Sequence, residues 1–308
     1  MAEMRAMEFT GPSEDLDLHL TTRSVPEPGD GELLIQICAA GVTPTEKLWY
    51  TTTHCRDGSP RRNAIPAHEF SGIVAALGTG ISGYRPGDLV FGMNDWFADG
   101  AIAEFCKTTP ASLAAKPSSL SHVEAASTPI SSLTAWQGLH SHAKLQKGER
   151  LLIHGGAGSV GLFAVQLAKL QEAHVIATAS AANIDFVKKL GADEIINYRE
   201  RRFEEVGRVD VIFDTVGGAT LERSWNVLGP DGRLVTIAAD AESSGDPRVK
   251  EAFFIVEANG QQLAHMAGLL DLGVLKTFVK AEVPLENAAS VYAGSVTGSP
   301  GKIVIRTL

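Results

Sequence analysis

The feature of this sequence that most restricts its fold is a glycine-rich stretch between an apolar run and an amphipathic one. Residues 151–161 read Leu-Leu-Ile-His-Gly-Gly-Ala-Gly-Ser-Val-Gly, which contains the pattern G-x-G-x-x-G. From about His122 onward, strands alternate with helices, and the strands are expected at 151–154, 175–178, 209–214 and 234–238. The sequence therefore predicts an α/β fold whose second part is a doubly wound parallel sheet.

Each glycine of the pattern has its own steric role. Gly156 permits the tight turn, Gly158 lets the backbone approach a pyrophosphate, and Gly161 lets helix and strand pack closely. The helix N-terminus adds partial positive charge, so residues 156–160 are expected to bind a dinucleotide. The predicted contacts are Gly156, Ala157, Gly158, Ser159 and Val160. A glycine turn without a ligand is the alternative for an isolated motif, whereas the repeated strand–helix units here favour binding.

The end of the second strand bears on which dinucleotide binds. NAD-selective proteins place a carboxylate there to hold the ribose 2′-hydroxyl, but residues 176–183 of this chain read Ile-Ala-Thr-Ala-Ser-Ala-Ala-Asn. No carboxylate repels a 2′-phosphate, and Thr178, Ser180 and Asn183 have groups that donate to one. The sequence therefore predicts NADPH, with an ordinary strand-to-helix turn as the alternative.

The first part of the chain has a different pattern. Short apolar runs at 33–38, 70–75, 89–93 and 101–106, broken by Gly, Pro and Asp, predict an all-β, barrel-like region. Residues 283–308 predict a short helix and then a strand at 302–306, which are expected to return to that first domain. Residues 253–256 predict a further strand, and residues 239–246 a surface loop.

Composition excludes several classes of protein. With 308 residues, of which 44% are hydrophobic and 20% charged, the chain is long enough for two domains. A net charge of −9 argues against nucleic acid as a partner. No apolar run long enough for a membrane span and no signal-peptide pattern occur, so we expect a cytoplasmic protein without a membrane partner. Cys38, Cys55 and Cys106 include no CxxC pair, which excludes a disulfide framework and a four-cysteine zinc lobe.

Short motifs occur in order over nearly the whole chain: Gly41-Val-Thr-Pro44, His68-Glu-Phe-Ser-Gly72, Pro86-Gly-Asp88, Leu133-Thr-Ala-Trp136, the glycine turn, Leu190-Gly-Ala-Asp193, Phe213-Asp-Thr-Val-Gly-Gly218 and Gly301-Lys-Ile-Val304. Together they resemble the medium-chain dehydrogenase/reductase superfamily, in particular its zinc-free quinone oxidoreductase and enone reductase branch. The resemblance implies a GroES-like catalytic domain of residues 1–123 and 274–308 and a Rossmann NADP-binding domain of residues 124–273. It also implies a homodimer or homotetramer.

The resemblance bears on zinc as well. Zinc alcohol dehydrogenases of the superfamily place a cysteine where this chain has Thr43, a histidine where it has His68, and a second cysteine near Ile130. Catalytic zinc normally takes three protein ligands, and only one of the three is kept, so no metal is expected. The chain also departs from the zinc-free branch, which usually has asparagine at position 43 and for which His68 is less typical.

The resemblance also implies further cofactor contacts. It places Pro44, Thr134 and Val216 near the nicotinamide half, and Tyr198 beside Ser180 at the 2′-phosphate. Tyr198 has a structural alternative, as a half-buried residue that closes the third strand. The resemblance also implies cofactor contacts, less directly, for Ile237, Ala238, Phe254, Ile255, Val256 and Lys302.

These features together predict an NADPH:quinone oxidoreductase-like enzyme that transfers hydride to a quinone or an α,β-unsaturated carbonyl without zinc. The candidate donors to the substrate are Thr43, Tyr50 and His68, with Trp49 and Trp96 as apolar walls. Each donor has an alternative, as a loop hydrogen bond for Thr43, a packed ring for Tyr50 and a satisfied core histidine for His68. The arginines of the loop 51–63 are expected to be mostly solvated.

Two other functions fit the sequence less well. One is a non-catalytic NADPH-binding sensor or structural protein, because the cofactor motif is better supported than any catalytic residue. The other is a zinc-dependent alcohol dehydrogenase with atypical ligands around His68 and Glu69.

Overall fold

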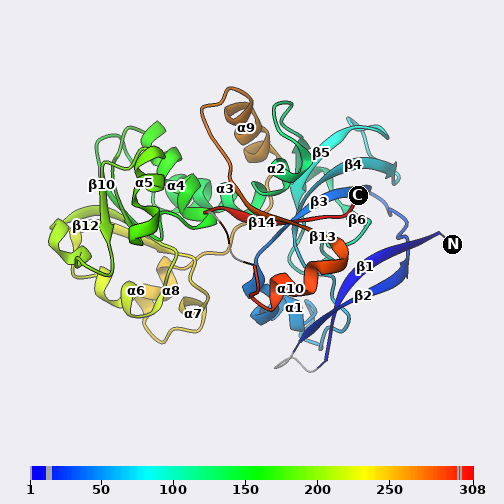
Figure 1. Ribbon diagram of the computed structural model, residues 1–308, viewed down its shortest axis with the longest axis horizontal. Coiled ribbons are helices and arrows are strands. Elements are labelled where there is room, and N and C mark those ends of the chain that lie inside the picture. The colour runs from blue at the N-terminus through cyan, green and yellow to red at the C-terminus, as the bar shows by residue number, and fades with distance from the viewer. Residues whose placement is uncertain (1, 12–15, 297, 299) are drawn as a thin grey trace. The chain divides into compact units, whose positions relative to one another are not determined.

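The computed structural model describes residues 2–11, 16–296, 298 and 300–308. Its contacts divide the chain into unit 1, Met1–Ile130 with Ala258–Leu308, and unit 2, Ser131–Glu257 (Figure 1). The sequence-based domain division at 123/124 and 273/274 stays a prediction, and the contacts group residues 124–130 and 258–273 with unit 1.

Unit 1 is built mainly of strands. Its described residues form a seven-stranded sheet in the order β13-β14-β3-β4-β5-β7, with β6 paired to β3, and a separate antiparallel hairpin of β1 and β2. The strands are β1 (Glu3–Thr10), β2 (Asp17–Ser24), β3 (Leu33–Val42), β4 (Glu69–Leu77), β5 (Leu89–Met93), β6 (Phe105–Thr108), β7 (Leu113–Ala115), β13 (Val279–Pro284) and β14 (Lys302–Arg306).

The sheet of unit 1 depends on β3, whose side chains are buried along most of its length. Because β3 pairs with β4, β6 and β14, it joins segments that are far apart in sequence. Its apolar residues belong to one core with Phe70, Val90 and Ile305. The last strand therefore completes the same core that the first strands begin.

The helices of unit 1 lie between its strands in sequence. They are η1 (Pro44–Leu48), α1 (Tyr50–Thr53), η2 (Pro110–Ser112), α2 (His122–Ala126), α9 (Gly260–Asp271), η6 (Leu285–Asn287) and α10 (Ala288–Tyr292). Two of them, α2 and α9, contact the seven-stranded sheet. A reciprocal capping box of Ser121 and Glu124 starts α2, and the Asn259 side chain caps α9. Helix α3 (Pro129–Trp136) runs from unit 1 into unit 2.

Unit 2 is a parallel sheet in the order β10-β9-β8-β11-β12 among its described residues. The strands are β8 (Arg150–His154), β9 (His174–Ala179), β10 (Glu194–Asn197), β11 (Val209–Asp214) and β12 (Leu228–Thr236). The order reverses direction between β8 and β11, as in a doubly wound sheet. The predicted α/β fold class is confirmed.

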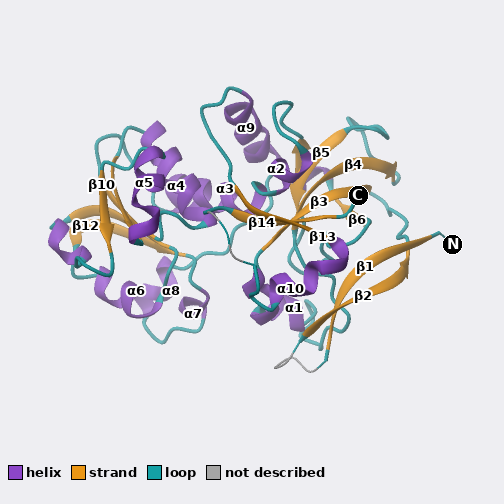
Figure 2. Ribbon diagram, in the orientation of Figure 1, coloured by secondary structure: helices purple, strands orange, loops and turns teal. Residues whose placement is uncertain are grey.

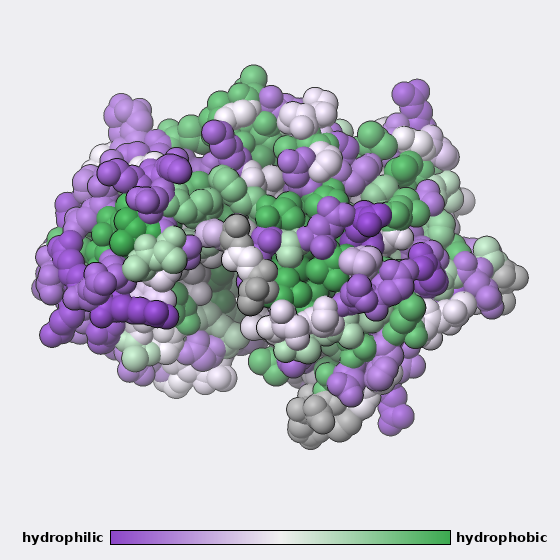
Figure 3. Space-filling view, viewed as in Figure 1, coloured by the Kyte–Doolittle hydropathy of each residue, from purple (hydrophilic) through white to green (hydrophobic). Residues whose placement is uncertain are grey.

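Helices pack against the strands of unit 2 (Figure 2). Helix α4 contacts β8 and β9, α5 contacts β9 and β10, and α8 contacts β12. The helices of this unit are η3 (Gln137–His142), α4 (Ser159–Leu170), η4 (Ala181–Asn183), α5 (Ile184–Lys189), η5 (Phe203–Val206), α6 (Gly218–Ser224), α7 (Ala239–Glu242) and α8 (Pro247–Ala252). Hydrophilic side chains gather on the face of the unit that carries β10 and β12 (Figure 3).

Some sequence-based expectations for single elements were wrong. Residues 253–256 form no strand of their own, because only Phe253 makes an isolated parallel bridge, to Thr236. Residues 239–246 begin with helix α7 instead of forming a loop throughout. The strand expected at 101–106 lies at Phe105–Thr108, where its pairing with β3 sets it. In the part of the chain that the structure describes, no helix has the length and apolar character needed to cross a bilayer.

Candidate functional site

The loops that follow the strands of unit 2 lie at one edge of its sheet. The strands are parallel, so the segments after β8, β9, β10, β11 and β12 all leave from the carboxyl edge. The glycine turn, Ser180, Tyr198, Val216 and Ile237 follow these strands in that order. The point between β8 and β11, where the strand order reverses, is where ligands of open α/β sheets bind.

The glycine turn is packed so tightly that side chains do not fit. A Cβ on Gly161 would lie 2.1 Å from the Gly155 carbonyl oxygen, and one on Gly156 would lie 2.9 Å from the Ala177 Cβ. Gly158 is exposed and is the N-cap of α4, which has 12 residues. The turn therefore brings bare backbone and a helix N-terminus to the carboxyl edge, a geometry that fits the pyrophosphate of a dinucleotide.

Thr178 has a role that the sequence did not predict. It is buried, and its hydroxyl oxygen accepts a hydrogen bond from the Gly155 amide at 3.1 Å, while its carbonyl accepts one from the Gly156 amide at 3.0 Å. Thr178 thus holds the glycine turn against β9. Because its hydroxyl is buried beneath the turn, its position does not favour the predicted contact with a 2′-phosphate.

The other predicted 2′-phosphate residues remain at the surface. Ser180 and Asn183 are partly exposed in the turn after β9, and Tyr198 is 55% exposed directly after β10. The register pairs Asn197 with Ala179, so Tyr198 follows on from the strand pairing at the level of Ser180. The predicted neighbourhood of Tyr198 and Ser180 agrees with this register.

Arg199 is a residue of this edge that sequence reasoning missed. Its guanidinium lies over the Tyr198 ring at 5.9 Å from the centroid. Within the described part of the chain, no carboxylate forms an ion pair with it. The signal in the sequence was the Arg that follows the strand-closing tyrosine, within the charged run 199–202.

A buried aspartate shapes the loop after β11. Asp214 accepts hydrogen bonds from the amides of Val216 and Gly217 and from the Thr236 hydroxyl, at 2.7–3.2 Å. Burial raises the pKa of Asp214, and the Thr236 and backbone hydrogen bonds oppose that rise. Held this way, the loop presents the Val216 side chain to solvent at the carboxyl edge.

The remaining predicted cofactor residues of unit 2 differ in exposure. Ile237 is partly exposed after β12, whereas Ala238 and Thr134 are buried. Of the three predicted residues after α8, Ile255 is exposed, whereas the Phe254 ring stacks on His142 at 4.3 Å and Val256 is buried. Direct contact with a ligand is easiest for the exposed members of this set.

In unit 1, the predicted residue Lys302 has protein partners. Its ammonium lies 2.5 Å from Glu69 Oε1 and donates a hydrogen bond to Thr43 Oγ1 at 2.8 Å. The other carboxylate oxygen, Glu69 Oε2, accepts from the Ile130 amide at 2.8 Å. Lys302 thus binds the predicted donor Thr43, a contact that no sequence pattern indicated. The predicted contact of Lys302 with the cofactor stays a prediction.

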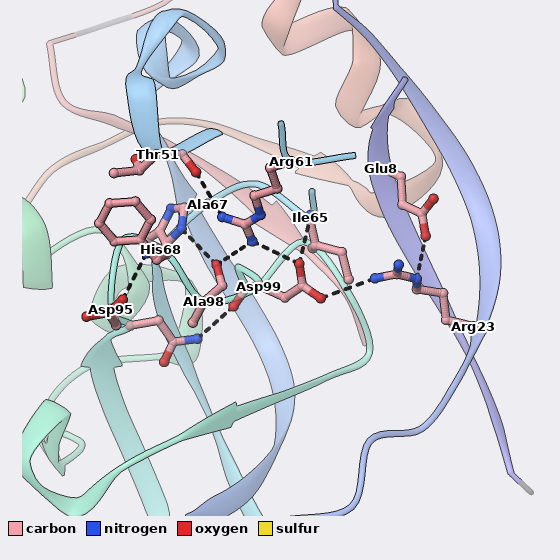
Figure 4. A network of polar contacts seen from close by, with 12 residues as sticks. Glu8, Arg23, Thr51, Arg61, Ile65, Ala67, His68, Asp95, Ala98 and Asp99 are labelled. Carbon is pink, nitrogen blue, oxygen red and sulfur yellow. Dashed lines mark hydrogen bonds and ion pairs between the residues drawn. The ribbon is translucent and has the colours of Figure 1, made fainter. Parts of the chain in front are cut away.

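The predicted donor His68 is 2% exposed and has an acceptor near each ring nitrogen. Nε2 lies 3.3 Å from the Ala98 carbonyl (Figure 4), and Nδ1 lies 3.4 Å from Glu46 Oε2. Glu46 also accepts from the Ala67 amide and from the Tyr292 hydroxyl. Burial, followed by the charge and hydrogen bond of Glu46, raises the pKa of Tyr292 well above its usual value. These contacts favour a structural role for His68.

Aromatic rings surround His68 and the segment that follows Thr43. The His68 ring lies 5.2 Å from Trp96, which meets Trp49 edge-on at 5.1 Å. Tyr50, the third predicted donor, is 52% exposed and stacks on His54 at 4.3 Å. Pro44 is partly exposed at the start of η1.

Arg61 differs from the other two arginines of loop 51–63, Arg56 and Arg62, which are exposed as expected. Its side chain is 9% exposed, and the guanidinium donates to the carbonyls of Thr51 and Ala98 and to Asp99 (Figure 4). Asp99 also binds Arg23, which in turn pairs with Glu8. This network joins the loop to the Ala98 segment that contacts His68, and to the β1–β2 hairpin.

Two family models match separate parts of the chain. The alcohol dehydrogenase GroES-like domain matches residues 29–121, and the zinc-binding dehydrogenase model matches residues 190–305. The expected GroES-like domain is thereby confirmed.

Known proteins match over nearly the full length. A quinone oxidoreductase of Mus musculus is 30% identical over 332 residues, covering 99% of this chain and 97% of the relative. The 2-methylene-furan-3-one reductase of Solanum lycopersicum is 29% identical, covering 100% of this chain and 80% of the relative. The solved structure of the quinone oxidoreductase from Coxiella burnetii superposes with a TM-score of 0.88 at 29% identity, with both chains covered completely. The chain therefore belongs to the medium-chain dehydrogenase/reductase superfamily, in its quinone oxidoreductase branch, and is an oxidoreductase that uses a nicotinamide cofactor.

Proposed function

We propose that this enzyme transfers hydride from NADPH to a quinone or an α,β-unsaturated carbonyl and does so without zinc. The observation that carries the proposal is the position of the Lys302 ammonium, which binds both Thr43 and Glu69. A metal ion at this position would need such side chains as free ligands. The names of the relatives support the class of acceptor, since they include quinone oxidoreductases and an enone reductase.

The side chains at the expected metal position do not fit zinc. Catalytic zinc takes three protein ligands at about 2.0–2.3 Å, mostly thiolates and imidazoles. Here Thr43 supplies a hydroxyl, His68 faces Ala98 and Glu46, and the Glu69 carboxylate is bound to an ammonium. Among the described residues, no group of three or more His, Cys, Asp or Glu side chains is arranged to hold a metal ion.

The carboxyl edge of unit 2 does fit a dinucleotide, which when bound supplies the hydride. Residues 156–160 would hold the pyrophosphate, because Gly156 and Gly158 carry no side chain and a helix begins there. Ser180, Asn183, Tyr198 and Arg199 would hold a 2′-phosphate, since they offer donors and positive charge and the turn after β9 carries no carboxylate. Val216 and Ile237 would contact the nicotinamide half.

The chemistry of the acceptor follows from the missing metal ligands. Reduction of a simple ketone builds an alkoxide, which zinc stabilises in metal-dependent enzymes. Reduction of a quinone or an enone builds a phenolate or an enolate, for which a hydrogen-bond donor is sufficient. Thr43 is the donor that we assign to this oxygen, and Trp49 and Trp96 would pack on a flat acceptor.

A titration of the purified, chelator-treated protein with NADPH and with NADH tests the cofactor. Cofactor oxidation with ortho-quinones, para-quinones and short enones, against a saturated ketone as control, then tests the acceptor. We expect tighter binding of NADPH than of NADH and turnover of the conjugated acceptors alone. Preference for NADH, or turnover that returns only when zinc is added, would contradict the proposal.

Metal analysis of the untreated protein completes the experiment. We expect substoichiometric zinc and the same activity before and after chelation. The expected homodimer or homotetramer and the cytoplasmic location stay predictions, which light scattering and cell fractionation test.

A further inference from the structure

Three segments of unit 1 meet at a buried ammonium because of strand register. Strand β14 pairs Ile303 with Val42, so Lys302 lies beside the end of β3, where Thr43 follows. Strand β4 pairs Glu69 with Gly41, one step further back along β3. The pairing of β3 with both neighbours thus brings the hydroxyl, the ammonium and the carboxylate together.

Gly41 makes room for the carboxylate. A Cβ at Gly41 would lie 2.7 Å from Glu69 Oε1 and 2.5 Å from the Ala126 carbonyl oxygen, so any other residue would displace Glu69. Glu69 is fully buried and Lys302 is 4% exposed. Burial raises the pKa of the Glu69 carboxyl, and the Lys302 ammonium opposes that rise. The ion pair is therefore fixed in place and largely withdrawn from solvent.

Thr43 connects this pair to the surface. The residue is partly exposed and stands at the N-cap of η1, where its side chain makes no capping hydrogen bond. An ammonium only donates, so the Thr43 oxygen is the acceptor of the bond from Lys302. The hydroxyl hydrogen has no acceptor among the residues that the structure describes, and the bond from Lys302 polarises it toward donation.

We propose that Thr43 donates its hydroxyl hydrogen bond to the oxygen of the acceptor, and that Lys302, held by Glu69, is a positioning residue whose fixed positive charge stabilises the negative charge that builds on that oxygen. Thr43 touches the substrate, and Lys302 acts through it. The contact is a hydrogen bond, and the proton that finally binds the reduced oxygen comes from water. This inference rests on the proposed function.

The arrangement gives the site a built-in cation in the absence of metal ligands. A donor aimed at a developing oxyanion in a partly desolvated site is typically worth a factor of about 100 to 1000 in kcat. Unlike a bound ion, this charge is covalently part of the chain and is insensitive to chelators. It also explains why a lysine, normally an exposed residue, is buried at this position.

The first arm of the test measures turnover of a para-quinone by the full chain. Thr43→Val keeps the shape of the side chain but removes the hydroxyl, and we expect kcat to fall about 100-fold with little change in the dissociation constant of NADPH. Thr43→Ser keeps the hydroxyl and is expected to stay within about threefold of the wild type. Equal activity of the valine and serine variants would overturn the role of Thr43.

The second arm removes the ion pair as a whole. The double variant Lys302→Met with Glu69→Gln leaves no unpaired buried charge, so it is expected to fold, which thermal unfolding checks. We expect kcat to fall at least about tenfold while KM and NADPH affinity stay near the wild-type values. Wild-type kcat in this variant, or a selective loss of NADPH affinity, would overturn the role of Lys302, the latter by making it a cofactor ligand.

A third arm needs no turnover, so it separates this inference from the proposed function. The protein saturated with NADP⁺ is titrated with para-nitrophenol, whose phenolate absorbs in the visible and stands in for the charged oxygen. We expect the wild type and Thr43→Ser to favour the bound phenolate, and Thr43→Val and the double variant to lose that preference. An inactive wild type counts against the proposed function, whereas equal phenolate binding by all four proteins counts against this inference alone.

Discussion

The two units of this enzyme stabilise charge with different groups, unit 2 with its backbone and unit 1 with its side chains. Unit 2 offers backbone to an expected anion, since no side chain fits at Gly156 or Gly161 of its glycine turn and helix α4 begins at the carboxyl edge. Unit 1 relies on polar side chains buried against each other, as in the ion pair of Lys302 with Glu69 and the contact of His68 with Glu46. A backbone site is sensitive to any side chain added at its glycines. A site made of buried side chains is sensitive to the loss of any one partner in its network.

The largest effect is expected where backbone alone forms the site. Gly161→Ala places a Cβ 2.1 Å from the Gly155 carbonyl oxygen, so α4 must move away from the turn. We expect NADPH affinity to fall more than about 100-fold, measured by fluorescence titration, because the pyrophosphate contacts depend on that spacing.

Gly245→Ala is the matched control, since nothing lies within 4 Å of the added Cβ. It is expected to bind NADPH as the wild type does. Unchanged NADPH binding by Gly161→Ala would contradict the proposal that the backbone of the glycine turn binds the pyrophosphate.

The buried polar contacts of unit 1 are tested by Glu46→Leu. This change leaves the Tyr292 hydroxyl and the Ala67 amide without their common acceptor and removes the carboxylate that lies 3.4 Å from His68 Nδ1. The free energy of unfolding is expected to fall by about 3–5 kcal/mol, measured by urea denaturation. Glu286→Gln breaks an exposed pair with Arg5 and should leave the denaturation midpoint unchanged. Equal midpoints for the two variants would show that burial does not matter here.

Unit 2 also contains a buried titratable side chain, His154, but this one is kept neutral. Burial lowers the pKa of His154 to about 4, below that of an unfolded histidine. The unfolded chain therefore binds this proton first, so stability is full above the unfolded pKa and is lost as pH falls toward about 4. The loss amounts to about 3 kcal/mol at most, since one pKa unit is about 1.4 kcal/mol.

Urea denaturation between neutral pH and pH 4 checks this, with His154→Leu as the comparison. The variant loses the hydrogen bond to Ser224, so its stability is lower at neutral pH, but its dependence on pH should be flatter. Parallel curves for wild type and variant would contradict the prediction.

The smallest effect concerns the side chains that supplement the backbone site. Arg199→Ala removes the guanidinium beside Tyr198 and is expected to weaken NADPH about tenfold while leaving NADH unchanged. Arg202→Ala is the control, because Arg202 is also an exposed arginine of this segment but pairs with Glu204. A loss of both cofactors alike would show that Arg199 does not bind the 2′-phosphate.

The same contrast explains how much the sequence predicted. The glycine turn, β8, β11 and β14 were located correctly, because period, length and glycine spacing are local properties. The family resemblance was correct for the same reason, since its motifs are short and lie in order. The hairpin of β1 and β2 and helix α7 were missed, because their patterns are weak and tertiary packing decides them.

The side-chain networks were beyond local patterns. Thr43, Glu69 and Lys302 are far apart in sequence, and only the register of β3 with β4 and β14 unites them. Thr178 was expected to face a phosphate, but its hydroxyl oxygen accepts from the Gly155 amide. Arg61 is nearly buried while its neighbour Arg62 is exposed, a difference that the sequence did not indicate. The type of a residue indicates which partners its side chain is able to bind, while the fold determines which of those partners lies within hydrogen-bond distance.

The position of β14 has a consequence for synthesis on the ribosome. Unit 2 is continuous, so it can fold once residue 257 has emerged, whereas β3 waits for β14 to cover its outer edge. Until β14 leaves the exit tunnel, the nascent chain carries a folded unit 2 and an open strand edge in unit 1. An exposed edge of this kind is a template for aggregation, which makes the interval before β14 inserts the stage at which a chaperone is of most use.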